Sequence, residues 1–210
     1  MINRSTRHTL GFFLLFIIIG ISLIVGLQLG LETITDPQKY LGCVPVNYTH
    51  NINQTVAFWM DKSLTPTQVI AGNFSDSPKT VLGAASGQKW IEIDLTKQIL
   101  IARQGSNIFL QTPVSTGLYN RTPVGNFHIL NKYPSVTLEG GSHLNQTYYY
   151  LPNVPYSQYF TDKFSFRGSY WHQDFGYRVG FGCIDMPIEA ARQLYYWTDT
   201  RDSPTRLIIH

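Results

Sequence analysis

A cysteine on a glycine-rich turn is the residue of this sequence whose type and surroundings best suit covalent chemistry. Cys183 follows Gly182, and His172 precedes the cysteine by eleven positions. A cysteine thiolate is a strong nucleophile, and a histidine exchanges protons near neutral pH. A glycine beside the thiol lets the backbone turn tightly and come close to a ligand. The stretch 164–186 therefore predicts a nucleophile, Cys183, with His172 as a candidate acid and base.

Two other interpretations of Cys183 stay open at this stage. Cys43 is the second of the two cysteines, and cysteines in an oxidising compartment commonly pair, although spacing alone does not decide it. Cys183 also suits an ordinary buried cysteine at a turn between a strand and a helix. A metal site from His172, Asp174 and Cys183 is not expected, because no zinc-type spacing occurs, and no cofactor is expected either.

The segment 10–31 is apolar, uncharged and long enough to cross a bilayer as one helix. Arg4 and Arg7 precede it and Glu32 follows it, so the positive-inside rule keeps residues 1–9 in the cytoplasm. A cleaved signal peptide would have a shorter apolar region that ends in small residues, and no such site precedes Glu32. The sequence predicts an uncleaved, single-pass transmembrane anchor with the rest of the chain outside the cytoplasm.

Composition narrows the possible partners and divides the exported part in two. The net charge is only +3 and no basic run occurs, which excludes a phosphate-backbone surface and hence a nucleic-acid partner. Residues 32–86 are rich in Asn, Thr, Gln, Ser and Pro, and neither the period of a strand nor that of a helix persists. This range is predicted to be a stalk or linker, and 87–210 the folded domain.

Alternating apolar residues and turn residues predict strands in the first half of this domain. A meander is expected at 90–95, 99–102 and 108–112, where short polar turns separate the apolar runs. Two further strands, 114–117 and 122–130, flank a loop that contains Gly, Asn and Pro.

The second half of the domain shows three different patterns. The range 133–155 is polar and aromatic and contains Gly140-Gly141, and we interpret it as a long loop that serves as a lid or binding surface. Apolar residues at helical spacing predict a helix at 187–197, and 205–209 is a last strand. The predicted fold is mainly β, a sandwich or meander with one packed α-helix.

Several segments, taken in order, resemble the L,D-transpeptidase catalytic domain of the YkuD type over residues 87–209. The segments that carry the resemblance are 89–95, 114–117, 122–127, 154–156, 170–172, 174–176 and 182–184. The resemblance implies that fold and an enzyme that cross-links or trims bacterial peptidoglycan outside the cytoplasmic membrane. With the anchor at 10–31, it implies a cell-membrane protein whose partners are peptidoglycan peptide stems. No oligomeric state is indicated.

The resemblance also implies a mechanism. Cys183 attacks the carbonyl before the terminal D-amino acid of a stem, and an acceptor amine or water resolves the thioester. The backbone N–H groups of Gly182 and Cys183 face the oxyanion. Arg167, Gly168, Tyr170, Trp171 and Asp185 are expected to line the cleft or set its electrostatics.

The sequence departs from the family at the positions that handle protons. Arg167-Gly168 stands where the family has His-Gly, Gly180-Phe181 where it has Ser-His, and Asp185 where it has Arg or Asn. A cation beside the thiol favours the thiolate, but an arginine does not accept a proton. His172 is the nearest replacement base. In a straight strand, however, residues 167 and 172 point to opposite faces, so a turn must intervene.

Two hypotheses follow from these departures. Arg167 and Asp185 are expected to form an ion pair across the cleft, in which a structural pair replaces a catalytic one. For function, the first interpretation is an anchored L,D-transpeptidase-like cysteine acyltransferase that uses Cys183 and His172. The alternative is a non-catalytic descendant that binds wall peptides or scaffolds wall enzymes.

Overall fold

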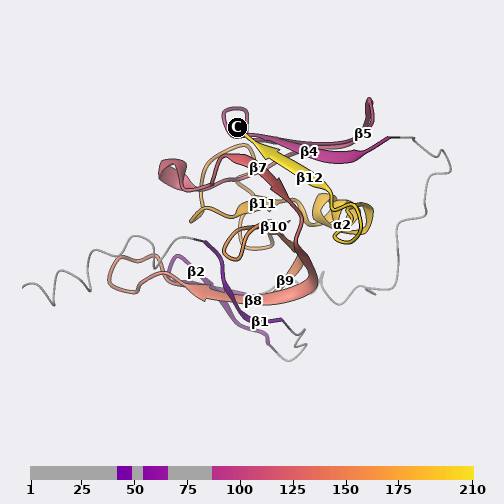
Figure 1. Ribbon diagram of the computed structural model, residues 1–210. Coiled ribbons are helices and arrows are strands. Elements are labelled where there is room, and N and C mark those ends of the chain that lie inside the picture. Colours follow the sequence, from indigo (N-terminus) through magenta and orange to yellow (C-terminus); the bar gives the residue numbers. More distant parts are fainter. Residues whose placement is uncertain (1–41, 49–53, 66–86) are drawn as a thin grey trace, which may run out of the picture. The chain divides into compact units, whose positions relative to one another are not determined.

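The computed structural model describes residues 42–48, 54–65 and 87–210 (Figure 1). The predicted anchor at 10–31 and the stub at 1–9 lie outside these residues and stay predictions. Among the described residues, none of the helices is both long and apolar enough for a membrane span.

A five-stranded sheet forms one part of the domain, in the order β6-β5-β4-β12-β7. Figure 1 labels β4, β5, β12 and β7 of this sheet. Its strands are β4 (Lys89–Asp94), β5 (Ile99–Gln104), β6 (Asn107–Pro113), β7 (Gly125–His128) and β12 (Arg206–Ile209). The predicted meander is confirmed as β4, β5 and β6, which pair antiparallel. The predicted last strand is confirmed as β12, which runs parallel to β4 and antiparallel to β7.

A seven-stranded sheet carries Arg167 and Asp185, and its strand β11 directly follows Cys183. Its main path is β1-β8-β9-β10-β11, and β2 pairs with both β3 and β9. The strands are β1 (Pro45–Asn47), β2 (Ala57–Trp59), β3 (Lys62–Leu64), β8 (Asn131–Gly140), β9 (Tyr149–Tyr159), β10 (Ser165–Gly168) and β11 (Ile184–Met186). The short strands β10 and β11 run parallel to one another.

The prediction of a long loop at 133–155 is wrong. Most of this range belongs to β8 and β9, which pair antiparallel in a long hairpin. The register shifts between Val136 and Leu138, and such a bulge breaks the alternation by which a strand is recognised. Polar side chains such as Ser135 and Ser157 are buried in these strands, so burial does not follow the apolar pattern.

Two further predictions are corrected. The range 114–117 is not a strand but forms isolated bridges, Ser115 with Asp185 and Gly117 with Gly180, because it crosses between the sheets. The range 32–86 is not wholly a stalk, because its described parts contain β1, β2 and β3. β1 pairs with β8 and β2 pairs with β9, so these parts belong to the sheet of the domain.

The predicted helix is confirmed as α2 (Ile188–Trp197), with Pro187 at its N-cap position. Its buried residues Ala190, Ala191 and Leu194 join a core that contains residues of both sheets. This core includes Phe166 of β10 and Ile184 and Met186 of β11. The turn at 180–183 leads directly into β11. Because the core that includes α2 also holds β11, this packing fixes the position at which the cysteine turn ends.

Candidate active site

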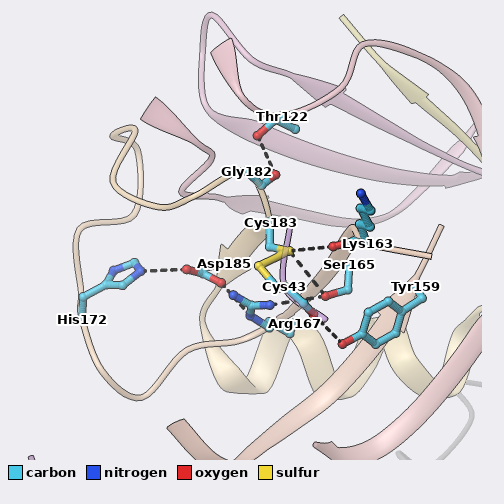
Figure 2. Close-up of polar contacts among 10 residues, drawn as sticks. All are labelled: Cys43, Thr122, Tyr159, Lys163, Ser165, Arg167, His172, Gly182, Cys183 and Asp185. Atoms are coloured by element: carbon cyan, nitrogen blue, oxygen red, sulfur yellow. Dashed lines mark hydrogen bonds and ion pairs between the residues drawn. A yellow bond between two sulfur atoms is a disulfide. The ribbon is translucent and has the colours of Figure 1, made fainter. Parts of the chain in front are cut away.

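The turn that carries Cys183 accepts only glycine at the preceding position. Gly182 has φ +124°, and a Cβ there would lie 2.6 Å from a ring carbon of Phe164 and 3.0 Å from the Arg121 carbonyl oxygen. The Thr122 hydroxyl donates to the Gly182 carbonyl at 2.8 Å and accepts the Gly117 N–H at 2.9 Å. The turn is thus held from the side of the 117–122 segment, as Figure 2 shows for Thr122.

Cys183 is bonded to Cys43 in a disulfide that spans 140 residues, with the two Cα atoms 6.2 Å apart (Figure 2). Both cysteines are buried in a core cluster with Val136, Leu138 and Trp171. The Cys43 N–H donates to the Lys163 carbonyl at 2.7 Å, and the Tyr159 hydroxyl donates to the Cys43 carbonyl at 3.1 Å. The pairing that the sequence left open is therefore formed, and Cys183 has no thiol in this state.

Arg167 and Asp185 form the predicted ion pair. They are register partners on the parallel strands β10 and β11, and the Arg167 Nε lies 3.0 Å from the Asp185 Oδ1 with side chains only 5% and 3% exposed. The Arg167 guanidinium also lies 5.5 Å from the centroid of the Trp171 ring. A buried charge needs a partner, so the two departures from the family pattern compensate one another.

His172 contacts the same carboxylate from the other side. Its Nε2 lies 3.2 Å from the Asp185 Oδ2, and its Nδ1 accepts the Asp174 N–H at 3.2 Å. Because Nδ1 accepts, the ring proton belongs on Nε2, which then donates to Asp185. β10 ends at Gly168, and the bend that follows resolves the strand-parity problem between residues 167 and 172.

The imidazole points at Asp185 in Figure 2, and Cys183 lies beyond that carboxylate. Within the described part of the chain, no hydrogen bond joins His172 to Cys183. The role of His172 as a base stays a prediction, and it requires the ring to leave Asp185.

The structure adds a residue that the sequence interpretation missed. The Ser165 hydroxyl lies 3.9 Å from the Cys183 Sγ and 3.4 Å from the Arg167 Nη1. The Lys163 carbonyl oxygen lies 3.7 Å from the same sulfur. Ser165 precedes Arg167 by two positions on a strand, so the rule that alternate residues share a face was the available signal.

An aromatic group surrounds this polar centre. The Trp59 ring centroid lies 6.0 Å from the centroids of both Trp171 and His172, and Phe181 stacks on Tyr149 at 5.5 Å. Trp59 was missed because it lies in the range that the sequence assigned to a stalk.

Two of the predicted cleft residues have structural contacts instead. The Tyr170 hydroxyl donates to the Pro152 carbonyl at 2.6 Å, and burial raises the pKa of Tyr170. A Cβ at Gly168 would lie 3.1 Å from the Ile188 Cα, so this glycine allows α2 to approach β10. The structure brings together Cys183, Gly182, Arg167, Trp171, His172 and Asp185, and leaves Gly168 and Tyr170 at the edge of the group.

The fold and this cysteine turn define a class of protein. The family model of the L,D-transpeptidase catalytic domain matches residues 88–209, which is more than half of the chain, and the chain belongs to this family. No curated protein matches the chain.

Solved structures of L,D-transpeptidases share the fold. An L,D-transpeptidase from Mycobacterium smegmatis is 20% identical, with a TM-score of 0.53 over 59% of this chain and 58% of that one. L,D-transpeptidase 3 from Mycobacterium tuberculosis, in complex with a faropenem-derived adduct, is 19% identical, with a TM-score of 0.52 over 58% and 60%. A mutant Enterococcus faecium L,D-transpeptidase is 24% identical, with a TM-score of 0.51 over 60% and 50%. This chain therefore spans about half to three fifths of the length of these proteins.

Proposed function

We propose that the domain is an L,D-transpeptidase-like cysteine acyltransferase that acts on peptidoglycan peptide stems, with Cys183 as the nucleophile of its reduced form. The observation that carries the proposal is the cysteine turn itself, in a chain that belongs to the family. Gly182 adopts a backbone conformation that favours glycine, and among the described residues no acceptor pairs with the N–H of Gly182 or of Cys183. Two unpaired N–H groups beside a nucleophile suit a developing oxyanion.

The proposed reaction has two halves. The Cys183 thiolate attacks the carbonyl carbon of a stem, the amide C–N bond breaks, and the leaving amine of the terminal D-amino acid takes a proton. An acceptor amine or water then attacks the thioester carbonyl and loses a proton, and Cys183 leaves as the thiolate. His172, released from Asp185, is the side chain that we propose for both proton transfers, because imidazole suits both directions near neutral pH.

The disulfide sets a condition for this chemistry. A thiolate, not a disulfide sulfur, is the nucleophile, so the Cys43–Cys183 form is inactive in acyl transfer. Two electrons from an external dithiol must reduce it before a stem can react. We also propose that residues 10–31 anchor the protein in the bacterial cell membrane with this domain outside, which places it beside the peptidoglycan.

Mass spectrometry of the full-length protein with a tetrapeptide stem tests the proposal. The reduced protein is expected to gain the mass of the stem without its terminal D-amino acid, on a peptide that contains Cys183. The oxidised protein and Cys183→Ala should gain nothing. An unmodified Cys183 in the reduced protein, under conditions where another member of the family forms the adduct, would contradict the proposal.

A second candidate function is a non-catalytic domain that binds wall peptides. The observation in its favour is that Cys183 and both ring nitrogens of His172 already have partners. In this case the disulfide is a structural bond, and the oxidised protein should bind the tetrapeptide stem as tightly as the reduced protein, without a covalent adduct. Calorimetric titration of both forms separates the two functions.

A further inference from the structure

The side chains around the sulfur of Cys183 form a chain of hydrogen bonds that starts from a buried ion pair. Asp185 Oδ1 accepts from Arg167 Nε at 3.0 Å, and Arg167 Nη1 lies 3.4 Å from Ser165 Oγ. Ser165 Oγ lies 3.9 Å from Cys183 Sγ. Figure 2 shows these groups in sequence, from the carboxylate through the guanidinium and the hydroxyl to the sulfur.

The direction of each hydrogen bond follows from the groups involved. A guanidinium only donates, so Ser165 Oγ is the acceptor from Arg167. Two acceptors compete for the single hydroxyl proton of Ser165, the Cys183 sulfur and the Tyr159 hydroxyl oxygen, and a thiolate is the stronger of the two because it is charged. A donor that itself accepts from a cation is polarised and donates more strongly.

We propose that Ser165, polarised by Arg167, is a positioning residue that holds Cys183 as a thiolate once the disulfide is reduced. The term positioning residue rests on the proposed acyltransferase function, but the stabilisation of the Cys183 thiolate by Ser165 does not depend on that function. Ser165 thereby takes over the thiolate-stabilising part of the work of the histidine that Arg167 replaces. Proton transfer to and from the substrate is a separate task that a serine beside an arginine does not perform.

Three features of the site oppose a thiolate, and each is offset. Burial disfavours a charged sulfur, but hydrogen bonds to the charged form favour it. The Asp185 charge is compensated by Arg167 at 3.0 Å. The Lys163 carbonyl, 3.7 Å from the sulfur, would favour a protonated thiol; the Cys43 N–H, which donates to it at 2.7 Å, offsets this in part because it occupies one of the two lone pairs of that oxygen.

The same arrangement determines which sulfur an external reductant attacks. In thiol–disulfide exchange, the thiol that is more stable as a thiolate leaves faster, and here that is Cys183. The thiolate of a dithiol therefore attacks Cys43 Sγ, the Cys43–Cys183 bond breaks, and its electron pair leaves with Cys183. The second thiol of the dithiol then attacks the mixed disulfide, which leaves a cyclic disulfide on the reductant and a thiol on Cys43.

The position of Cys43 agrees with this direction. It lies two residues before β1, which is at the edge of its sheet and, among the described strands, pairs with β8. Val44 and Val46 beside it are 54% and 59% exposed. Local opening of an edge segment costs less than opening of the central strands, so Cys43 becomes accessible before Cys183.

The rate of alkylation by iodoacetamide, measured against pH, tests the proposal on full-length Cys43→Ala, in which Cys183 is the remaining cysteine. The midpoint is expected below ~8.5, the value of an ordinary cysteine. Ser165→Ala should raise the midpoint by about one unit, the size of one hydrogen bond to a charged group. Ser165→Thr, which keeps the hydroxyl, should restore it. Ser169→Ala is the matched control, because Ser169 is buried and its hydroxyl has no partner among the described residues.

A second measurement needs no substitution at the site. Full-length oxidised protein is treated with a monothiol at limiting concentration, quenched with acid and digested. The mixed disulfide is expected predominantly on Cys43. Equal midpoints for Ser165→Ala and its control, or a mixed disulfide predominantly on Cys183, would overturn the proposal. Neither readout involves a peptide stem, so a failure here is distinct from a failure of acyl transfer.

Discussion

The buried Arg167–Asp185 pair gives a sharp prediction about stability. In Asp185→Asn, the shape of the side chain is kept but the guanidinium loses its counter-charge in a site where the two side chains are only 5% and 3% exposed. Removal of one partner of a buried ion pair leaves an uncompensated charge and costs about 3–5 kcal/mol. The lost contact with His172 Nε2, 3.2 Å from Asp185, adds to this effect.

Urea denaturation of the oxidised protein measures the change, provided that the slope of the unfolding free energy against urea stays constant. The matched control is Glu189→Gln on α2, which breaks an ion pair with Arg192 in which the Glu189 side chain is 61% exposed. Its effect should stay within about 1 kcal/mol. The double variant Arg167→Met with Asp185→Leu should recover most of the loss, because an apolar pair of similar volume replaces a buried ion pair at little cost.

A loss below about 1 kcal/mol in Asp185→Asn, equal to that of the control, would refute this reasoning. It would mean that Arg167 reaches water or another partner in solution. The hydrogen bonds from Arg167 through Ser165 to the Cys183 sulfur would then lack a cation held in one position.

Three other perturbations have expected outcomes. Reduction of the disulfide, which spans 140 residues, should lower the free energy of unfolding by up to about 5 kcal/mol on the chain-entropy estimate, measured by urea denaturation with and without dithiothreitol. Gly182→Ala should lower the free energy of unfolding by at least about 1–3 kcal/mol because of the left-handed backbone, and by more because of the contact with Phe164. Gly176→Ala, at φ +98° with open space around the added Cβ, should show the backbone effect alone in the same assay. Burial lowers the pKa of Lys132 to about 8, against an ordinary 10.5, so between these pH values the folded protein binds fewer protons than the unfolded chain. The wild type should therefore gain stability relative to Lys132→Met as the pH rises from about 8 to about 10. A difference in thermal midpoint that stays constant over this pH range would contradict the prediction.

The sequence predicted the elements whose side chains alternate regularly. β4 was found because Ile91 and Ile93 alternate with acidic residues and face the core, and β5 and β6 were found because short polar turns bound their apolar runs. The helix was found because its apolar residues repeat at helical spacing after Pro187. The β8–β9 hairpin was missed because a register shift interrupts β8 and because Ser157 and Gln158 are buried within β9.

The candidate site was predictable only in part. The Arg167–Asp185 pair was expected because both residues replace others of the family's catalytic pattern and their charges are opposite. Cys43 was not assigned as the partner of Cys183, since 140 residues separate them and spacing carries no information on pairing. Trp59 gains meaning only from the pairing of β2 with β9, which brings a distant segment to the site, whereas Ser165 could have been found from its place two residues before Arg167 on one strand.

The most direct test of the account is intact-mass spectrometry of full-length Cys43→Ala with a tetrapeptide stem and no reductant. This variant cannot form the Cys43–Cys183 disulfide, so the account predicts an acyl adduct on Cys183 where oxidised wild type shows none. A protein that folds, binds the stem and keeps an unmodified Cys183 would contradict the claim that this cysteine is the nucleophile.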